Sequence, residues 1–325
     1  MLSKVLKAAA IISASLILLS GCAINMPVPI KDPVASNLPY GKTTAAPVNL
    51  TFLNEQSDAD KAQFMTGLIP MNLLYKDKPF ESVTWVTQHT VKEMAARGLP
   101  VTLGNDAASG TKVSIKRLHI ENHRVSGFSP FVTFTTLKAD VMVAGAPQRV
   151  TAYVKRGKVP VWSFDEVIDP TYNDPLATLT KEFAAKLNQK LFGQVVADDQ
   201  VNALIAKVSK NTAPDAYLDV YQLGFSNNSI AIPELVKLTA HSDEYVRLAA
   251  ISSLGILKAV NQTDMLIALY ELKDGLWQDR AMALKAVGDM DTPKSRAYLK
   301  GEFAKYEGRT DKEAVWTKEI IQLYL

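Results

Sequence analysis

The sequence predicts an α+β domain followed by an all-α domain, and two observations lead to this prediction. Between residues 48 and 194, segments that alternate apolar and polar side chains occur together with two segments of helical spacing. After residue 199, a pattern of paired helices repeats with a shift of 33 residues. The 325 residues are enough for two cores of ordinary domain size.

The strands of the first domain are predicted from alternation. Residues 48–53 alternate as a half-buried strand does, and residues 111–122, 131–143 and 148–155 are three further strand segments. Residues 144–147, Ala-Gly-Ala-Pro, join the last two segments as a hairpin loop. Such strands bury one face best in an antiparallel sheet that packs against helices.

Two amphipathic helices are predicted to cover that face. The first starts near Pro79 and ends at Gly98, and the second has Asp174 as its N-cap and ends near Gly193. Their apolar stripes are Phe80, Val83, Val86, Thr90 and Met94 in the first helix, and Leu176, Leu179, Phe183, Leu187 and Leu191 in the second. We therefore expect an antiparallel sheet with two helices on one face for residues 48–194.

The strand over residues 111–122 changes its inward face near Lys116, which indicates a β-bulge. Beyond the bulge, His119, Glu121 and His123 share the outward face. Imidazole and carboxylate groups are adequate zinc or copper ligands, but the two histidines of one strand would lie about 13 Å apart. We expect a solvated sheet face there and no metal site.

The second domain is predicted from a repeat. Residues 246–255 align with residues 279–288, so that Arg247 matches Arg280 and Gly255 matches Gly288. A shorter helix precedes each copy, at residues 232–240 and 263–272, and weaker copies flank them at residues 201–224 and 293–324. One helix pair cannot bury its apolar face alone, so stacked pairs bury it against one another. Arginines that recur where the geometry recurs are expected to be structural.

This pattern resembles the HEAT-like repeat family, in which an apolar helix and an acidic turn precede a second helix that opens with Val-Arg, as in residues 232–247. The resemblance implies a solenoid of about four helix pairs over residues 199–325, with an acidic residue six positions before each Arg. Asp274 takes that place before Arg280, whereas His241 stands before Arg247. The resemblance also implies a protein-binding concave surface lined by the second helices.

The start of the chain has the parts of an export signal: Lys4 and Lys7, an apolar run over residues 8–19, and small residues before Cys22. The run is shorter than the roughly 20 residues of a membrane-spanning helix. Leu19, Ser20, Gly21 and Cys22 resemble the lipobox of bacterial lipoproteins. The resemblance implies a signal peptide over residues 1–21, cleavage by signal peptidase II and a lipid on Cys22. Because Ala23 follows the cysteine, it also implies the outer membrane. The alternative is an ordinary secretion signal with an incidental cysteine.

Residues 22–47 are predicted to be a lipidated, extended tether, because they contain five prolines and few large apolar side chains. At about 3.1 Å per residue, the tether would reach roughly 75 Å from the membrane. Removal of residues 1–21 leaves 34 basic against 33 acidic residues, so the mature chain has no electrostatic basis for binding nucleic acid.

An apolar stretch over residues 64–75 contains Phe64, Leu68 and Leu73 and is interrupted by a glycine and a proline. We favour burial beneath the sheet, but if exposed the stretch would mark an interaction site. The same alternatives apply, with less force, to residues 127–131, which include Phe128.

The order of elements behind a lipobox is similar to the small α/β domains of the YajG and LptE groups of bacterial lipoproteins. The leading hypothesis is a lipid-anchored outer-membrane protein that faces the periplasm and acts as a non-catalytic binding platform for a periplasmic or outer-membrane protein. The alternative is an envelope assembly or transport accessory whose α+β domain binds a lipid, a glycan or a barrel protein. An enzyme ranks last, because the sequence has no phosphate-binding loop, no nucleophile elbow and no second cysteine. No cofactor is expected.

Overall fold

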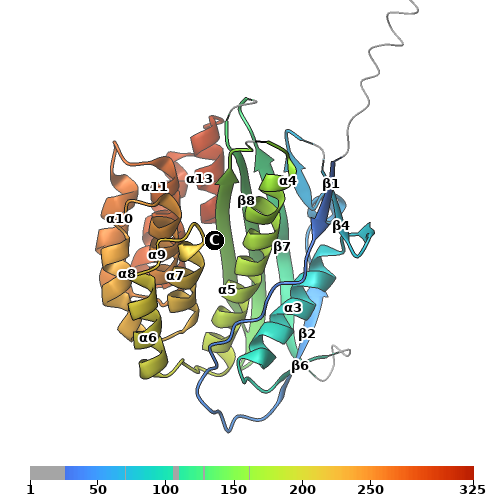
Figure 1. Cartoon of the computed structure of the whole chain (residues 1–325), viewed down its shortest axis with the longest axis vertical. Coiled ribbons are helices and arrows are strands. Elements are labelled where there is room, and N and C mark those ends of the chain that lie inside the picture. Colours follow the sequence, from blue (N-terminus) through green and yellow to red (C-terminus); the bar gives the residue numbers. More distant parts are fainter. Residues whose placement is uncertain (1–25, 70, 105–109, 127–128, 161) are drawn as a thin grey trace, which may run out of the picture.

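The computed structural model describes residues 26–325 except residues 70, 105–109, 127–128 and 161. A mixed β-sheet with two main helices occupies the N-terminal half, and a stack of helices follows it (Figure 1). The predicted α+β class with a helical C-terminal part is confirmed.

The main sheet is mixed, so the prediction of an antiparallel sheet is wrong. Strands β7, β8 and β9 are antiparallel, whereas β2 is parallel to both β6 and β7. Parallel neighbours need a crossover, and helix α3 supplies it between β2 and β6. The strand order is β6 (Val101–Leu103), β2 (Val48–Asn54), β7 (Thr111–His123), β8 (Phe131–Val143) and β9 (Ala146–Lys158), and the short β3 (Met65–Gly67) pairs with the far end of β7.

Two local predictions for the sheet are confirmed. The register of β7 against β8 shifts between Ile115 and Arg117, where the bulge was expected. The hairpin is present, but its loop is Ala144 and Gly145 alone, because Ala146 and Pro147, predicted to be part of the loop, already belong to β9. Ala144 and Gly145 have positive φ angles, 49° and 79°. A two-residue type I′ hairpin requires positive φ at both positions.

Helices α3 (Ser82–Ala96) and α5 (Asp174–Leu191) cover one face of the sheet, but their starts differ from the prediction. Pro79 lies in the short strand β5 (Lys78–Pro79), not in a helical turn. Asp174 is not an N-cap, because α4 (Asp165–Ile168) and a π-helical turn (Asp169–Asn173) lead directly into α5. The Asp174 carboxylate instead accepts a hydrogen bond from the Tyr217 hydroxyl at 3.1 Å.

Residues 26–41 pack against the body, so the prediction of a free tether is wrong for them. Strand β1 (Met26–Ile30) pairs in parallel with β4 (Met71–Tyr75) and buries Val28 and Ile30. The prolines at positions 27 and 29 alternate with these buried residues on the exposed side. An edge strand accepts proline because the missing N–H faces away from the ladder.

The segment after β1 is fixed by Arg97 at the end of α3. This side chain is fully buried and donates hydrogen bonds to the Leu38 carbonyl, the Tyr40 hydroxyl and the Phe225 carbonyl at 2.7 to 2.9 Å. Because Phe225 ends helix α7 (Ala216–Phe225), Arg97 joins the N-terminal segment, the α+β part and the first helix pair. We call residues 31–41 the N-terminal strap.

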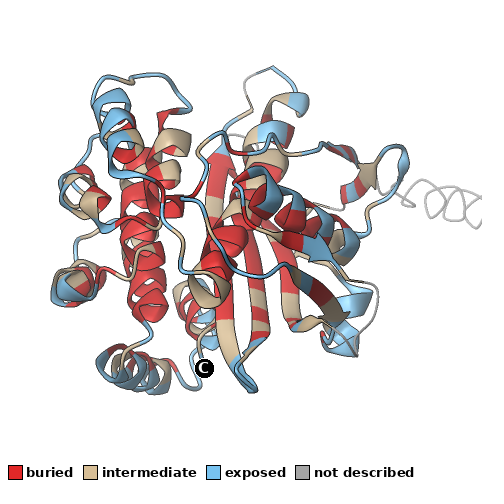
Figure 2. Ribbon diagram, turned by 90° about the horizontal axis from the view of Figure 1, so that it is seen from below, coloured by how far each residue is buried: buried red, intermediate tan, exposed pale blue. Residues whose placement is uncertain are grey.

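The C-terminal half contains four successive helix pairs within the described residues. Their second helices, α7, α9 (Glu244–Ile256), α11 (Trp277–Met290) and α13 (Lys312–Gln322), stack on one another. Figure 2 shows buried residues concentrated in these inner helices and in the sheet, with exposed residues on the outer helices. The first helices of the four pairs are α6 (Asp198–Val208), α8 (Ile232–Leu238), α10 (Thr263–Glu271) and α12 (Pro293–Lys305).

Glycines let the second helices approach closely. A Cβ at Gly255 would lie 2.7 Å from the Cα of Ala286, and a Cβ at Gly288 would lie 2.5 Å from the ring of Tyr324. Gly224 makes the same kind of contact with Ser253 one repeat earlier. The repeated glycine therefore has a packing role in each unit.

The concave side of the stack is filled by the chain itself, so the prediction of an open binding surface there is wrong. The ring of Phe134 in β8 lies 5.8 Å from Trp277 and 4.9 Å from Trp316. The Tyr245 hydroxyl in α9 donates to the Gly157 carbonyl in β9 at 2.6 Å. The second helices thus pack on the other face of the sheet and on α5.

Replacement of Gly255 by Ala is expected to lower the free energy of unfolding by about 1–3 kcal/mol, because the added methyl overlaps backbone of α11. Gly301 in α12 is the control, because a Cβ there meets nothing within 4 Å. Gly301→Ala should leave stability unchanged or raise it by about 0.5–1 kcal/mol. Chemical denaturation of both variants measures the difference, and equal stabilities would contradict the close packing.

Candidate functional site

The predicted lipidation motif, Leu19, Ser20, Gly21 and Cys22, lies outside the described residues. Lipid attachment therefore stays a prediction. The first described residue, Met26, already belongs to β1. No helix in the described part of the chain is long and apolar enough to cross a bilayer.

Arg247 and Arg280 join neighbouring repeats. The Nε of Arg247 lies 3.0 Å from Asp279 Oδ2, and Nη1 of Arg280 lies 3.0 Å from Glu313 Oε1 in the following unit. Asp274, the acidic residue six positions before Arg280, is exposed and forms no ion pair with it among the described residues. Arg280 instead donates through Nε to the Tyr270 carbonyl at the end of α10, at 2.9 Å, and reaches Glu313 in α13.

The apolar stretch over residues 64–75 divides between core and surface. Leu73 is buried in β4, and Phe64 is half-buried with its ring 5.6 Å from Phe80. Leu68 is exposed, because Gly67 ends β3 with a φ of 141° and the chain then leaves the sheet. The prediction of burial is thus correct for Leu73 and wrong for Leu68. Phe128 lies outside the described residues.

The outward face with His119, Glu121 and His123 is covered, not solvated as predicted. Trp316 in α13 donates through Nε1 to Glu121 Oε1 at 3.1 Å. Nε2 of His119 lies 2.8 Å from the Thr66 hydroxyl, and burial lowers the pKa of His119 to about 4. Among the described residues, no three His, Cys, Asp or Glu side chains are grouped so as to hold a metal ion.

A cluster of four buried charges joins the two halves of the molecule. Nζ of Lys186 in α5 lies 2.7 Å from Glu182 and 2.6 Å from Asp289, and Nζ of Lys285 in α11 lies 2.6 Å from Glu182 and 2.8 Å from Asp289. We call Glu182, Lys186, Lys285 and Asp289 the buried charge cluster. Its two positive and two negative charges balance.

Hydrogen bonds from neutral groups complete the cluster. Lys186 also donates to the Thr151 carbonyl at 2.8 Å, and the Tyr324 hydroxyl donates to Asp289 at 3.0 Å. Burial alone would lower the pKa of Lys285, but Asp289 and Glu182 outweigh it and hold that pKa above its usual value. For Asp289, burial acts to raise the pKa, and Lys186 and Lys285 together hold it below its usual value. For Lys285 and Asp289, these shifts favour the charged forms.

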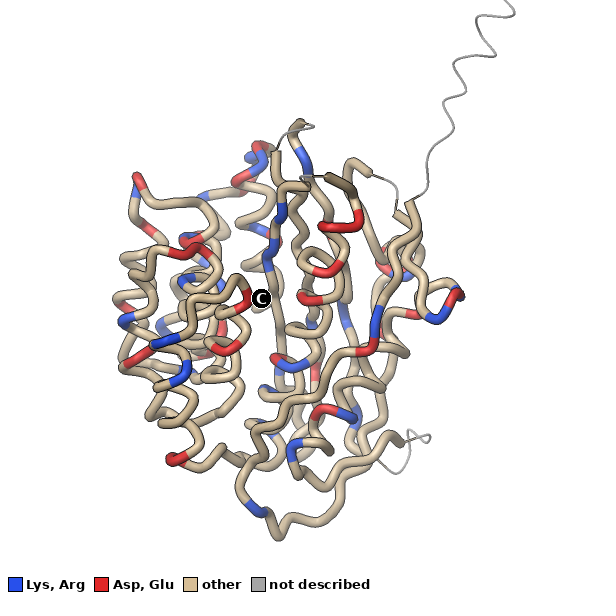
Figure 3. Tube along the Cα trace, viewed as in Figure 1, with Lys and Arg blue, Asp and Glu red and all other residues tan. Residues whose placement is uncertain are grey.

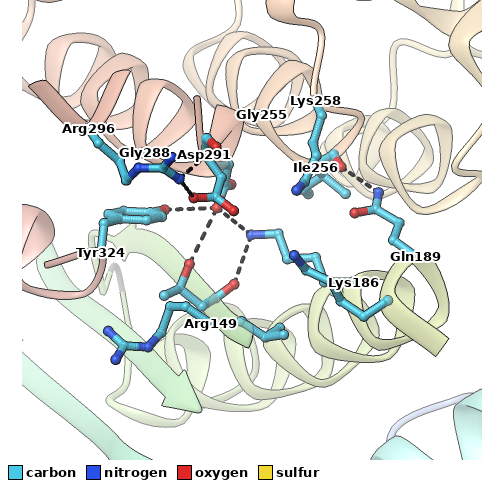
Figure 4. Close-up of a pocket in the computed structure, with 14 residues that line it drawn as sticks. Arg149, Lys186, Gln189, Gly255, Ile256, Lys258, Gly288, Asp291, Arg296 and Tyr324 are labelled. Atoms are coloured by element: carbon cyan, nitrogen blue, oxygen red, sulfur yellow. Dashed lines mark hydrogen bonds and ion pairs between the residues drawn. The ribbon is translucent and has the colours of Figure 1, made fainter. Parts of the chain in front are cut away.

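A pocket opens beside this cluster, between β9, α5 and the ends of α9 and α11 (Figure 4). Its volume is about 50 Å³, enough for a few water molecules or a small polar group. The lining is rich in cations, with five basic against two acidic side chains. The basic residues are Arg149, Lys186, Lys190, Lys258 and Arg296, and the acidic residues are Asp289 and Asp291.

Two of the five cations have no carboxylate partner among the described residues. Arg296 pairs with Asp291 at 2.5 Å, and Arg149 pairs with Asp140 at 2.5 Å. Lys190 and Lys258 form no such pair. Burial, followed by the charge of Lys258, lowers the pKa of Lys190, and the charge of Asp291 partly offsets this although it forms no ion pair with Lys190. Two adjacent, partly buried ammonium groups repel each other, so an anion between them would be attracted to both. The mouth of this pocket is the candidate functional site.

Sequence reasoning missed this site for a physical reason. Glu182 and Lys186 are four residues apart on one helix, as are Lys285 and Asp289 on another, and such pairs usually mark an exposed helix face. Lys190 continues the same row on α5. The regular four-residue spacing was a usable signal, but only the packing of α11 against α5 shows that the rows are buried.

Comparisons with known proteins do not assign this chain to a family. No family model matches the chain, and no curated protein matches it. One similar solved structure, titled "Crystal structure of uncharacterized protein", is 10% identical and covers 51% of this chain and 97% of its own, with a TM-score of 0.31.

Replacement of Lys285 by Met is expected to cost about 3–5 kcal/mol of unfolding free energy, because Glu182 and Asp289 would each lose a buried partner. The matched control is Lys294→Met, which removes an exposed pair with Asp264 and should change stability by less than about 1 kcal/mol. Urea denaturation compares the two. Similar losses for both variants would show that the buried charge cluster does not hold the halves together.

Proposed function

We propose that this protein is an outer-membrane lipoprotein, anchored through a lipid on Cys22, that acts as a non-catalytic binding platform for an acidic segment of a periplasmic or outer-membrane protein. The observation that carries the binding role is the pair Lys190 and Lys258 at the mouth of the pocket. Two ammonium groups that lack a carboxylate partner among the described residues favour an anionic ligand group.

The location of the pocket supports a platform. Lys190 lies in the last turn of α5, and Lys258 follows the end of α9. Met26, where the chain continues from the anchor, starts β1 at the opposite end of the sheet (Figure 1). A lipid on Cys22 would therefore direct the pocket away from the membrane and towards the periplasm.

A carboxylate is the ligand group that suits the pocket in size. The volume of about 50 Å³ admits the end of an Asp or Glu side chain but not a whole ligand. Most of the partner would then lie on the surrounding surface, formed by α5, α9 and α11. This arrangement fits a protein segment that presents acidic side chains.

The anchor is tested on the native product. Mass spectrometry of the amino-terminal peptide is expected to show an acylated Cys22, and Cys22→Ser is expected to release the protein from envelope membranes. A protein with an unmodified amino end, or a Cys22→Ser variant that still sediments with membranes, would contradict the anchor.

The binding role is tested by in-envelope photo-cross-linking with a probe at Gln189, which lines the same pocket. Lys190→Gln with Lys258→Gln should reduce the cross-linked product at least tenfold, because the attraction for an acidic group is lost. Lys61→Gln with Lys237→Gln is the control, since both lysines are exposed and paired with carboxylates elsewhere. Undiminished capture by the first variant would refute the acidic-partner role. A captured lipid or glycan instead of a protein would favour the transport or assembly alternative.

A further inference from the structure

Four large apolar side chains in the described part of the chain are at least 64% exposed: Val34 in the N-terminal strap, at 84%, and three others. Trp162 is 91% exposed, Val125 is 77% exposed and Leu68 is 64% exposed. They belong to three different connections, after β9, after β7 and after β3. The backbone N–H of Trp162 donates a hydrogen bond to Glu166 Oε1 at 3.0 Å.

The strand register brings the three connections to one end of the sheet. Gly67, which precedes Leu68, pairs with Asn122, three residues before Val125. Phe131 at the start of β8 pairs with Lys158, four residues before Trp162. The end of β7, the start of β8 and the end of β9 are adjacent in an antiparallel sheet. We call Leu68, Val125 and Trp162 the apolar end.

The same end is where the chain arrives from Cys22. Met26 at the start of β1 pairs with Met71, three residues after Leu68. Only four residue steps separate Cys22 from Met26, and an extended chain covers at most about 14 Å in four steps. Figure 1 places the start of β1, the β7–β8 connection and α4 at the same end of the molecule.

From this coincidence we propose that the apolar end docks onto the surface of the phospholipid bilayer that holds the lipid anchor. The proposal rests on the anchor proposed above and adds the surface that meets the membrane. The segment from Cys22 to Met26, at most about 14 Å long, keeps the apolar end within reach of the headgroup layer of the membrane, which is roughly 5–8 Å thick on each side. The exposed apolar residues then enter that layer together.

The chemistry of the end fits a lipid interface. Tryptophan is enriched at membrane surfaces, where its ring lies at headgroup depth. Leu272 and Leu276, both exposed, lie in the α10–α11 connection, which Figure 1 places towards the same end but on the side of the helix stack. Lys and Arg are interspersed with Asp and Glu over the helical half (Figure 3), so apolar contact and not charge would provide the attraction there.

The opposite end supplies matched control residues. Val195 follows the end of α5 and Val260 follows the end of α9, and both are exposed. These two helix ends lie together, because Gln189 in the last turn of α5 donates to the Ile256 carbonyl at 2.7 Å. The starts of both helices lie nearer the apolar end, where Tyr245 contacts Gly157. Val195→Ser with Val260→Ser therefore replaces two exposed apolar residues, as many as Leu68→Ser with Val125→Ser, but leaves the apolar end unchanged.

The test uses the full lipidated protein in vesicles of phosphatidylethanolamine and phosphatidylglycerol whose acyl chains carry bromine. Trp162→Phe identifies the emission of Trp162 by difference. We expect bromine to quench more than half of that emission, and aqueous iodide to quench it at least threefold less than without vesicles. Leu68→Ser with Val125→Ser should restore iodide quenching, whereas Val195→Ser with Val260→Ser should not.

Two results would overturn the docking surface. One is a vesicle-bound, acylated protein whose Trp162 stays open to iodide. The other is a Trp162 that is shielded from iodide in native envelopes but is not quenched by the brominated lipid of the vesicles. That result would mean that a protein, and not the bilayer, covers Trp162. An unmodified amino end in mass spectrometry would refute the anchor alone, and Trp162 quenching on vesicles would still decide the docking surface.

Discussion

The buried charge cluster fixes how the two halves of this molecule meet. Charges that are removed from water must be matched closely by partners, and Lys186 and Lys285 each contact the same two carboxylates. A rotation of the helix stack against α5 would separate both pairs that cross between the helices, Lys186 with Asp289 and Lys285 with Glu182. Purely apolar packing between helices would permit small shifts, whereas this cluster specifies one arrangement.

The N-terminal strap adds a second constraint of the same kind. Arg97 is fully buried and binds two backbone carbonyls and the Tyr40 hydroxyl, which come from the strap and from α7. The strap therefore links the same two halves from another side. Because the sheet, α5 and the helix stack form one body, the concave side of the stack serves as core. Binding then has to use edges and ends, which is where the pocket and the apolar end lie.

The pocket and the apolar end lie at opposite ends of the molecule. The pocket with Lys190 and Lys258 is at the ends of α5 and α9, and Trp162 and Met26 are at the opposite end of the sheet. A lipoprotein attached through a short segment next to the apolar end would be held upright on the bilayer, with the cationic pocket facing the periplasm. A long tether would allow many orientations, whereas the pairing of β1 with β4 leaves only four residue steps between Cys22 and the folded body.

Elements whose signal is local could be predicted from the amino-acid sequence alone. The strand alternation, the bulge near Lys116, the hairpin that begins at Ala144 and the recurrent Gly255 and Gly288 are properties of neighbouring residues or of an internal repeat. Three features became evident only from the folded structure: the parallel pairing of β1 with β4 and of β2 with β7, the covering of the face with His119, and the burial of Lys186 and Lys285. Those features depend on contacts between segments far apart in the chain. A proline-rich strand or a four-residue charge spacing looks the same in sequence whether water or another helix lies against it.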